Sequence, residues 1–259
     1  MLKTKILKQP VILQTERRLW GSHASGWQIN SPSPDSLPRF STIETLVPDD
    51  VWKSKKTALF LPEIACFPIR VPVEEKVKTS ELEHFLKWTL KSRLPFPLED
   101  AWIRYMPIHG TSSWLVFSLP GSWVQDTFDF FNTKGVHLGY IGTIAGLILE
   151  SMRAPDMKVL LSYYGYYIYI HQKSGKLNQF QIRRFPIKDG QIQFEEFINS
   201  DFPMETSSGS QNPVPIYCFS HGRQKEWNNY FEQHGPGIFQ MHEANENMAQ
   251  LLVQMGRKT

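Results

Sequence analysis

The sequence RVPVEEKVKTSELEHFLKWTLKSRLPFPLEDAWIRY, residues 70–105, is the most informative part of this 259-residue chain. Its centre predicts an amphipathic helix, because apolar residues recur there at helical spacing. Ser80 and Glu83 fit a capping box at the start of this helix, and Pro95 and Pro97 predict its end. The apolar positions of the stripe are Leu82, Phe85, Leu86, Leu90 and Leu94.

On both sides of this helix, the sequence alternates between expected strands and helices. Toward the N-terminus we expect short strands at residues 11–13, 27–29, 57–61 and 66–71. Toward the C-terminus we expect strands at 101–107 and 113–119 around a turn at His109–Gly110–Thr111. After them we expect a helix that opens at Pro120–Gly121–Ser122 and closes at Lys134–Gly135, a short connecting strand at 136–139 and a helix at 141–152.

The second half of the chain predicts a three-stranded meander followed by βα units. The expected strands of the meander are residues 157–162, 166–171 and 179–185, with a hairpin turn at Ser174–Gly175. A short helix is expected at 192–198, a polar loop at 201–213, strands at 214–219 and 237–241, and helices at 223–234 and 244–255. This alternation predicts an α/β fold with mixed sheets flanked by helices.

The composition excludes several classes of protein. Basic residues number 28 and acidic residues 25, for a net charge of +3, and aromatic residues make up 13% of the chain. Such a chain is too apolar for a disordered protein, and two cysteines provide neither a disulfide framework nor a four-cysteine zinc site. The first ten residues lack the apolar run of a signal peptide, and no stretch approaches the roughly 20 apolar residues of a spanning helix. We therefore expect a cytoplasmic protein that reaches a membrane only through a partner.

The sequence contains no local motif for catalysis, metal binding or phosphate binding. It has no G-x-x-x-x-G-K-[ST], no G-x-G-x-x-G after a strand and no G-x-S-x-G. Ser220–His221–Gly222 lies between a strand and a helix, where ligands often bind, although a plain turn is the simpler interpretation. The tyrosines at 163, 164, 166, 167 and 169 could stack on single-stranded nucleic acid. Because alternate side chains of a strand share a face, part of this set is expected in the core instead.

With these elements in order, residues 70–105 resemble the type IV pilus assembly protein PilM and the related cytoplasmic domain of the type II secretion protein GspL. That family has a strand, an acidic linker, a helix and an element written lPf-x-leda before a strand with a tyrosine. Here the element is Leu94-Pro95-Phe96-Pro97-Leu98-Glu99-Asp100-Ala101, and Arg183-Arg184-Phe185-Pro186 resembles the family's R-x-i-p strand. The order of elements follows the family over most of residues 58–255.

The resemblance implies the actin-like (ribonuclease H-like) fold, in which two related α/β halves flank a nucleotide cleft. We expect the first half at residues 1–155, with an insertion-type subdomain at 74–107, and the second at 156–259.

The nucleotide loops of the family are degenerate in this chain. The family's second phosphate loop begins with Asp, then Gly, then Thr or Ser, whereas the matching residues here are Ser162-Tyr163-Tyr164-Gly165. The adenosine-side Gly-Gly turn matches Ser220–His221–Gly222, which keeps one glycine. Backbone amides need glycine to approach phosphates closely. We therefore expect a pseudo-ATPase with no catalytic residues, no cofactor and no metal.

The resemblance also implies a role and partners. It predicts a non-catalytic cytoplasmic scaffold of a bacterial type IV pilus or related secretion assembly, peripheral to the inner membrane. The expected partner is the cytoplasmic tail of a PilN-like inner-membrane protein, with the assembly ATPase as a second partner and no nucleic acid. We place part of the partner surface at Arg93, Phe96 and Tyr105, although core packing is the simpler role for Phe96. An actin-like ATPase with divergent loops, a GspL-like subunit that docks a secretion ATPase and an unrelated α/β domain stay open as alternatives.

Overall fold

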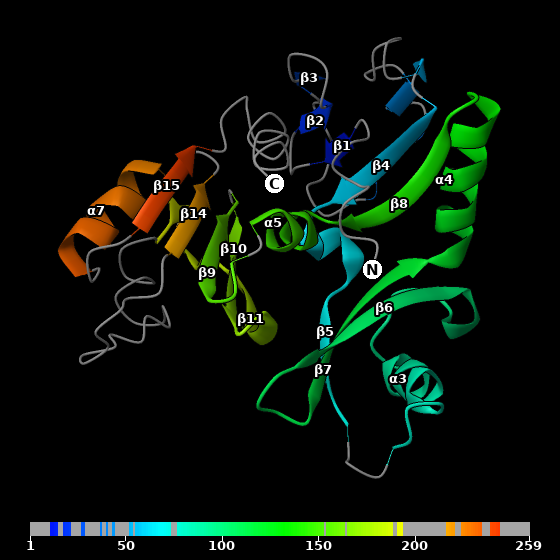
Figure 1. The fold of residues 1–259 in the computed structure, drawn as a ribbon, viewed down its shortest axis with the longest axis horizontal. Helices are drawn as coiled ribbons and strands as arrows, with labels where there is room; N and C mark the ends of the chain where they lie inside the picture. The colour runs from blue at the N-terminus through cyan, green and yellow to red at the C-terminus, as the bar shows by residue number, and fades with distance from the viewer. Residues whose placement is uncertain are drawn as a thin grey trace. The chain divides into compact units, whose positions relative to one another are not determined.

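The computed structural model describes residues 11–14, 18–21, 27–28, 37, 40, 43–44, 52–53, 55–73, 77–152, 154–163, 165–188, 191–193, 216–220, 224–234 and 239–243. These residues fall into two compact units, the first within Met1–Arg153 and the second within Ala154–Asn245. Each unit contains a five-stranded sheet of its own (Figure 1).

The main sheet of the first unit is formed by β1 (Val11–Gln14), β2 (Arg18–Gly21), β3 (Trp27–Gln28), β4 (Lys56–Leu61) and β8 (His137–Thr143). The strand order is β3-β2-β1-β4-β8. The first three strands form an antiparallel meander, and β4 runs parallel to both β1 and β8. The strands expected at 11–13 and 57–61 are therefore confirmed, and the one expected at 27–29 is confirmed at its described residues, 27–28. The short connector expected at 136–139 is wrong, because β8 is a longer strand that pairs with β4 along its length.

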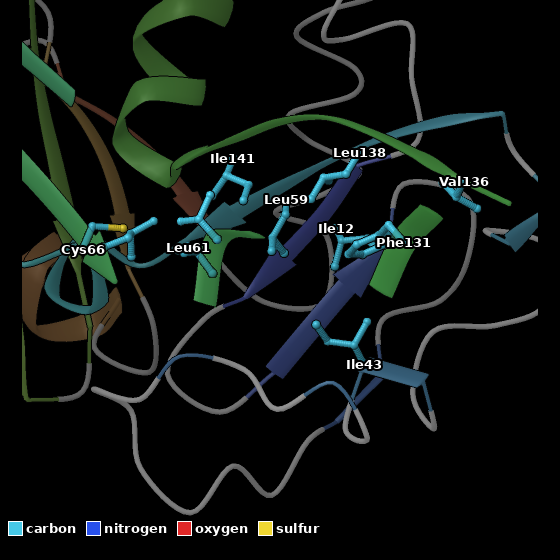
Figure 2. Close-up of a cluster of buried hydrophobic side chains, with 11 residues drawn as sticks. Ile12, Ile43, Leu59, Leu61, Cys66, Phe131, Val136, Leu138 and Ile141 are labelled. Atoms are coloured by element: carbon cyan, nitrogen blue, oxygen red, sulfur yellow. The ribbon is translucent and has the colours of Figure 1, made fainter. Parts of the chain in front are cut away.

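A buried apolar cluster joins this sheet to the helix α4 (Gly121–Thr133). Figure 2 shows its members gathered around the β1 and β4 strands, with the Phe131 ring of α4 beside Ile12. The helix begins directly after Pro120 and ends at a left-handed glycine, Gly135 (φ 74°), as the sequence predicted. The buried members of the cluster are Ile12, Ile43, Leu59, Leu61, Cys66, Leu119, Val124, Phe131, Val136, Leu138 and Ile141.

The first unit also contains a three-stranded antiparallel sheet of β5 (Ile69–Pro72), β6 (Ala101–Ile108) and β7 (Ser113–Pro120), in the order β5-β7-β6. The helix α3 (Leu82–Leu90) buries its apolar stripe against one face of this sheet. The capping box expected at Ser80 is wrong, because the N-cap residue is Glu81 and no side chain caps the helix.

A short helix replaces the start of the strand expected at 66–71. The 3-10 helix η2 (Glu63–Cys66) ends at Phe67, whose backbone is left-handed (φ 42°), and β5 begins only after this bend.

The second unit has the strand order β11-β10-β9-β14-β15. The expected meander is confirmed as three antiparallel strands, with its hairpin turn at Ser174 (φ 50°) and Gly175 (φ 72°). The helix expected at 192–198 overlaps the end of a small hairpin at Ile192, and its residues 194–198 lie outside the described residues, as do 201–213 and 244–255. The elements of this unit are β9 (Met157–Ser162), β10 (Tyr166–Lys173), β11 (Lys176–Arg184), β12 (Ile187–Lys188), β13 (Gln191–Ile192), β14 (Ile216–Ser220), α7 (Gln224–His234) and β15 (Phe239–Glu243). The helix α5 (Ile144–Met152) completes the first unit.

Candidate functional site

The two sequence segments that resemble the family's second-half nucleotide loops begin at the same end of the second unit's sheet. β9, β14 and β15 are parallel neighbours, and Ser162, Ser220 and Glu243 are aligned partners at their carboxyl ends. In open α/β sheets, ligands bind at the carboxyl ends of parallel strands. The topology therefore brings Ser162 and Ser220 to the place where a nucleotide would be held. Tyr164, His221 and Gly222 lie outside the described residues.

The turn between β9 and β10 is closed by its own backbone and filled by aromatic rings. The Tyr163 N–H donates a hydrogen bond to the Tyr166 carbonyl oxygen at 2.8 Å, and the Gly165 carbonyl accepts one from the Phe185 N–H at 3.0 Å. The Tyr163 and Tyr166 rings stack with their centroids 4.6 Å apart and a 20° interplanar angle. Ser162, Tyr163 and Tyr166 are each no more than 2% exposed. A phosphate would find the Tyr163 amide already bonded and large buried rings in place of small residues.

The tyrosines considered as a nucleic-acid stacking platform lie in the interior. Tyr163, Tyr166, Tyr167 and Tyr169 are all buried, and the Tyr167 ring contacts Phe185 and Trp227. Because stacking on bases requires exposed ring faces, these four residues act as core side chains. The platform hypothesis is wrong for them.

Two cysteines and one glutamate are buried in the cores of the two units. No group of three His, Cys, Asp or Glu side chains in the described part of the chain could hold a metal ion. Burial raises the pKa of the Cys66 and Cys218 thiols, and the Glu63 carboxylate adds to the rise at Cys66. Glu63 is itself fully buried, and its Oε1 accepts a hydrogen bond from the Ala145 N–H at the start of α5. Its carboxylate thus caps a helix N-terminus from 82 positions away in the sequence.

The three residues expected at a partner surface have different neighbours. Arg93 is exposed in the turn after α3, and its N–H donates a hydrogen bond to the Leu90 carbonyl. Phe96 is half-buried, with its ring edge-on to Phe67 at 5.6 Å. Tyr105 is half-buried on β6, with its ring edge-on to Trp114 at 5.7 Å, and belongs to the cluster beneath α3. Of these three residues, Arg93 is therefore the one whose side chain is exposed to solvent.

Strand β6 offers an edge that sequence reasoning did not identify. It pairs with β7 from Ala101 to Ile108, and no described strand pairs with its other side. Arg104 and Met106 are exposed on the face opposite Tyr105, and the Arg104 guanidinium lies 4.8 Å from the Trp102 ring centroid. The sequence alone could have assigned alternate residues of this strand to its two faces. Its position at the edge of the sheet depends on strand pairing, which only the structure reveals.

Asp100 has a structural role that explains part of the lPf-x-leda element. Its Oδ1 accepts a hydrogen bond from the Ser122 N–H at 2.6 Å, and its Oδ2 accepts one from the Ser122 hydroxyl at 2.8 Å. A Cβ atom on Gly121 would lie 3.0 Å from the Asp100 carbonyl oxygen, so a larger residue there would require the backbone at Asp100 to shift. The Asp100 carboxylate therefore caps α4 and fixes the junction between β7 and this helix.

Replacing Asp100 with alanine is expected to destabilise the first unit by about 1–2 kcal/mol, because two bonds at the N-terminus of α4 are lost. Urea unfolding followed by circular dichroism measures this change. Asp126→Ala, which removes an exposed carboxylate from the same helix, is the matched control and should cost about 0.5 kcal/mol or less. Equal effects of the two substitutions would contradict the capping role.

Among the described residues, no helix combines the length and the apolar character that crossing a membrane requires.

No protein-family model and no curated protein sequence matches the chain.

Solved structures with the same fold include three that align over nearly the whole chain. The cytoplasmic domain of EpsL, an inner membrane component of the type II secretion system of Vibrio cholerae, covers 96% of this chain and 94% of its own, with 9% identity and a TM-score of 0.51. A Bacteroides thetaiotaomicron protein with an actin-like ATPase fold and unknown function covers 97% and 98%, with 9% identity and a TM-score of 0.54. A chain of the PilM–PilN type IV pilus biogenesis complex covers 96% and 94%, with 14% identity and a TM-score of 0.55. The chain therefore has the actin-like α/β fold, and its suspected likeness to PilM and GspL is confirmed at the level of the fold.

Proposed function

We propose that this protein is a non-catalytic scaffold of a bacterial type IV pilus or related secretion assembly, at the cytoplasmic face of the inner membrane. The observation that carries the proposal is the turn between β9 and β10, where stacked, buried tyrosines stand in the place of a phosphate loop. The fold likeness to EpsL and to the PilM–PilN complex supports the biological setting. On this proposal, the two units are the two related halves of the actin-like fold.

The same turn supports independence from nucleotides. Admitting a phosphate there would require breaking the bond between Tyr163 and Tyr166 and moving two buried rings. The resemblance aligns Ser162 with the acid that would hold magnesium. The Ser162 hydroxyl is buried with no hydrogen-bond partner among the described residues. The Tyr163 N–H is therefore not available to a phosphate, and no carboxylate at this position can bind magnesium. We therefore infer a pseudo-ATPase without a bound cofactor.

The edge of β6 suits the expected partner, the extended cytoplasmic tail of a PilN-like membrane protein. An extended segment can add to an open sheet edge through backbone hydrogen bonds, while side chains beside the edge provide specificity. β6 supplies an eight-residue edge, and Arg104 and Met106 are exposed along it. Pro107 lacks an N–H, so we place the bonded register N-terminal to it.

Arg93, Phe96 and Tyr105 belong to this proposal because Tyr105 lies on β6, and Arg93 and Phe96 lie in the segment that leads into this strand. The exposed guanidinium of Arg93 is suited to a carboxylate of the tail. Phe96 and Tyr105 are half-buried, so each can offer only part of its ring to the tail. We assign them a secondary role in binding.

Isothermal titration calorimetry of the full chain tests the proposal with two ligands. The first is magnesium-ATP, and the second is a synthetic peptide of the cytoplasmic tail of the membrane protein encoded beside this one. We expect binding of the peptide and none of the nucleotide. Arg104→Glu with Met106→Glu should weaken the peptide about tenfold or more. Arg70→Glu, an exposed arginine on the opposite edge strand β5, is the matched control and should leave affinity unchanged.

Each alternative function predicts a different result, and a third titration with a purified secretion ATPase completes the comparison. Tight ATP binding without peptide binding would restore an actin-like ATPase with divergent loops. Binding of a purified secretion ATPase, without the tail, would favour the GspL-like subunit. If the peptide binds the variant with Arg104→Glu and Met106→Glu as tightly as the parent protein, the edge of β6 is not the binding site.

A further inference from the structure

Trp88 is the most exposed large apolar side chain among the described residues. It lies on α3 with 67% of its surface exposed, and Met106, at 37%, is the other large apolar residue in the exposed class. The same helix buries Leu82, Leu86 and Leu90 in the cluster against the three-stranded sheet. Trp88 therefore faces solvent on the opposite side of the helix, where the packing of α3 does not require an indole.

Positive charge gathers around the C-terminal turn that carries Trp88. Lys91, one helical turn further along, and Arg93 are exposed, and neither forms an ion pair with any residue whose position is described. Lys87 is compensated, because its Nζ lies 3.0 Å from the Glu83 carboxylate. The uncompensated charge beside the indole is therefore positive.

The surroundings of Trp88 distinguish a membrane surface from a protein partner. A protein interface typically centres on a cluster of large apolar side chains that exclude water around the anchor. The exposed positions one turn from Trp88 are instead His84, Lys91 and Ser92, all of them polar. An isolated indole beside cations matches the boundary of a bilayer, where tryptophan is enriched and lysine and arginine contact anionic headgroups.

We propose that the Trp88 surface, defined as His84, Trp88, Lys91 and Arg93, docks onto a membrane that contains anionic phospholipids. The indole lies at the level of the headgroups, while Lys91 and Arg93 contact phosphate oxygens. One indole and two cations give a weak, reversible contact that orients the three-stranded sheet on the membrane rather than anchoring it. This docking goes beyond the proposed scaffold function and does not rest on it, because it needs neither a tail nor an ATPase.

Vesicle co-sedimentation of the full chain tests this surface. The vesicles contain one part phosphatidylglycerol to three parts phosphatidylethanolamine, and pure phosphatidylcholine vesicles serve as the comparison. We expect binding to the anionic vesicles only, and weaker binding as salt is added. Trp88→Ala and Lys91→Glu should each lower the partition coefficient about fivefold or more. Both side chains are exposed, so thermal unfolding should stay close to that of the parent protein.

The matched control is Lys225→Glu on α7, which makes the same charge change at an exposed site of the second unit. It should leave vesicle binding within about twofold of the parent, because the Trp88 surface is intact. Brominated lipids provide a second readout: they should quench part of the emission of the parent protein, and this part should be missing in Trp88→Phe. No binding to anionic vesicles, equal binding to phosphatidylcholine, or an equal loss in Lys225→Glu would overturn the proposal.

Discussion

Both cysteine thiols are expected to resist modification in the native protein and to react only when their own unit opens. Cys66 is 3% exposed within the core of the first unit, and Cys218 is fully buried on β14 of the second. Burial raises the pKa of both thiols, and at Cys66 the Glu63 carboxylate raises it further. Because the thiolate is the reactive form, these groups lack both access and ionisation.

Labelling with Ellman's reagent at about pH 8 measures this protection. We expect a native rate at least about a thousandfold below that of the chain unfolded in urea, since opening a stable unit costs about 5 kcal/mol or more. The single-cysteine variants Cys66→Ala and Cys218→Ala assign each rate to one unit. A native thiol that reacts within about tenfold of the unfolded rate would contradict its burial.

Burial of the two thiols should also make the free energy of unfolding depend on pH in the alkaline range. A free thiol titrates near pH 8.5, whereas the folded pKa of Cys66 and Cys218 is raised. Their contribution to stability is therefore complete below about pH 8.5 and is lost above it, because the unfolded chain releases protons that the native chain keeps. The free energy of unfolding should fall by about 1.4 kcal/mol per pH unit for each thiol. Cys66→Ala should remove this slope from the first unit.

Local patterns in the sequence predicted most elements of the fold. The leucines of α3 are spaced at one helical turn, and the helix forms between Leu82 and Leu90 with that stripe buried. Ser174–Gly175 predicted a hairpin, and both residues adopt the left-handed backbone that such a turn needs. These features depend on residues within a few positions of one another, so a single sequence contains enough information to find them.

Contacts between distant residues could not be predicted in this way. β8 extends beyond its expected length because it pairs with β4, some eighty positions earlier in the chain. The Asp100 carboxylate caps α4 across 22 positions, and no local motif announces that bond. At Ser80 the local motif was present but unused, since α3 begins after Glu81 without a side-chain cap. Tertiary contacts decided the first two cases, at β8 and at Asp100.

The candidate sites show the same division. The sequence shows directly that position 162 is not an acid. The hydrogen bond from the Tyr163 N–H to the Tyr166 carbonyl depends on the geometry of the turn, which the sequence does not show. The alignment of Ser162 with Ser220 depends on parallel pairing of β9 and β14. Trp88, by contrast, lies outside the apolar stripe of α3 by helical spacing alone, so the sequence contained a signal that this indole is exposed.

Replacing Phe131 with alanine is expected to destabilise the first unit by about 3–5 kcal/mol, the usual cost of removing a buried phenylalanine. Phe131 is fully buried, and its ring contacts Trp52 and Phe130 at centroid distances of 5.5 Å each. The cavity would open in the cluster that also contains Cys66. Urea unfolding measures the loss, and Phe128→Ala, a half-buried residue on the same helix, is the matched control with a smaller expected effect.

Thiol labelling then shows whether the loss is confined to one unit. A destabilisation of this size should accelerate labelling of Cys66 about a hundredfold or more, if opening of the first unit controls the rate. Cys218 should keep its parent rate, because every buried member of the Phe131 cluster belongs to the first unit. Equal acceleration of both thiols would show that the two units unfold as a single cooperative body, and would contradict the expectation that each half is stabilised by its own core.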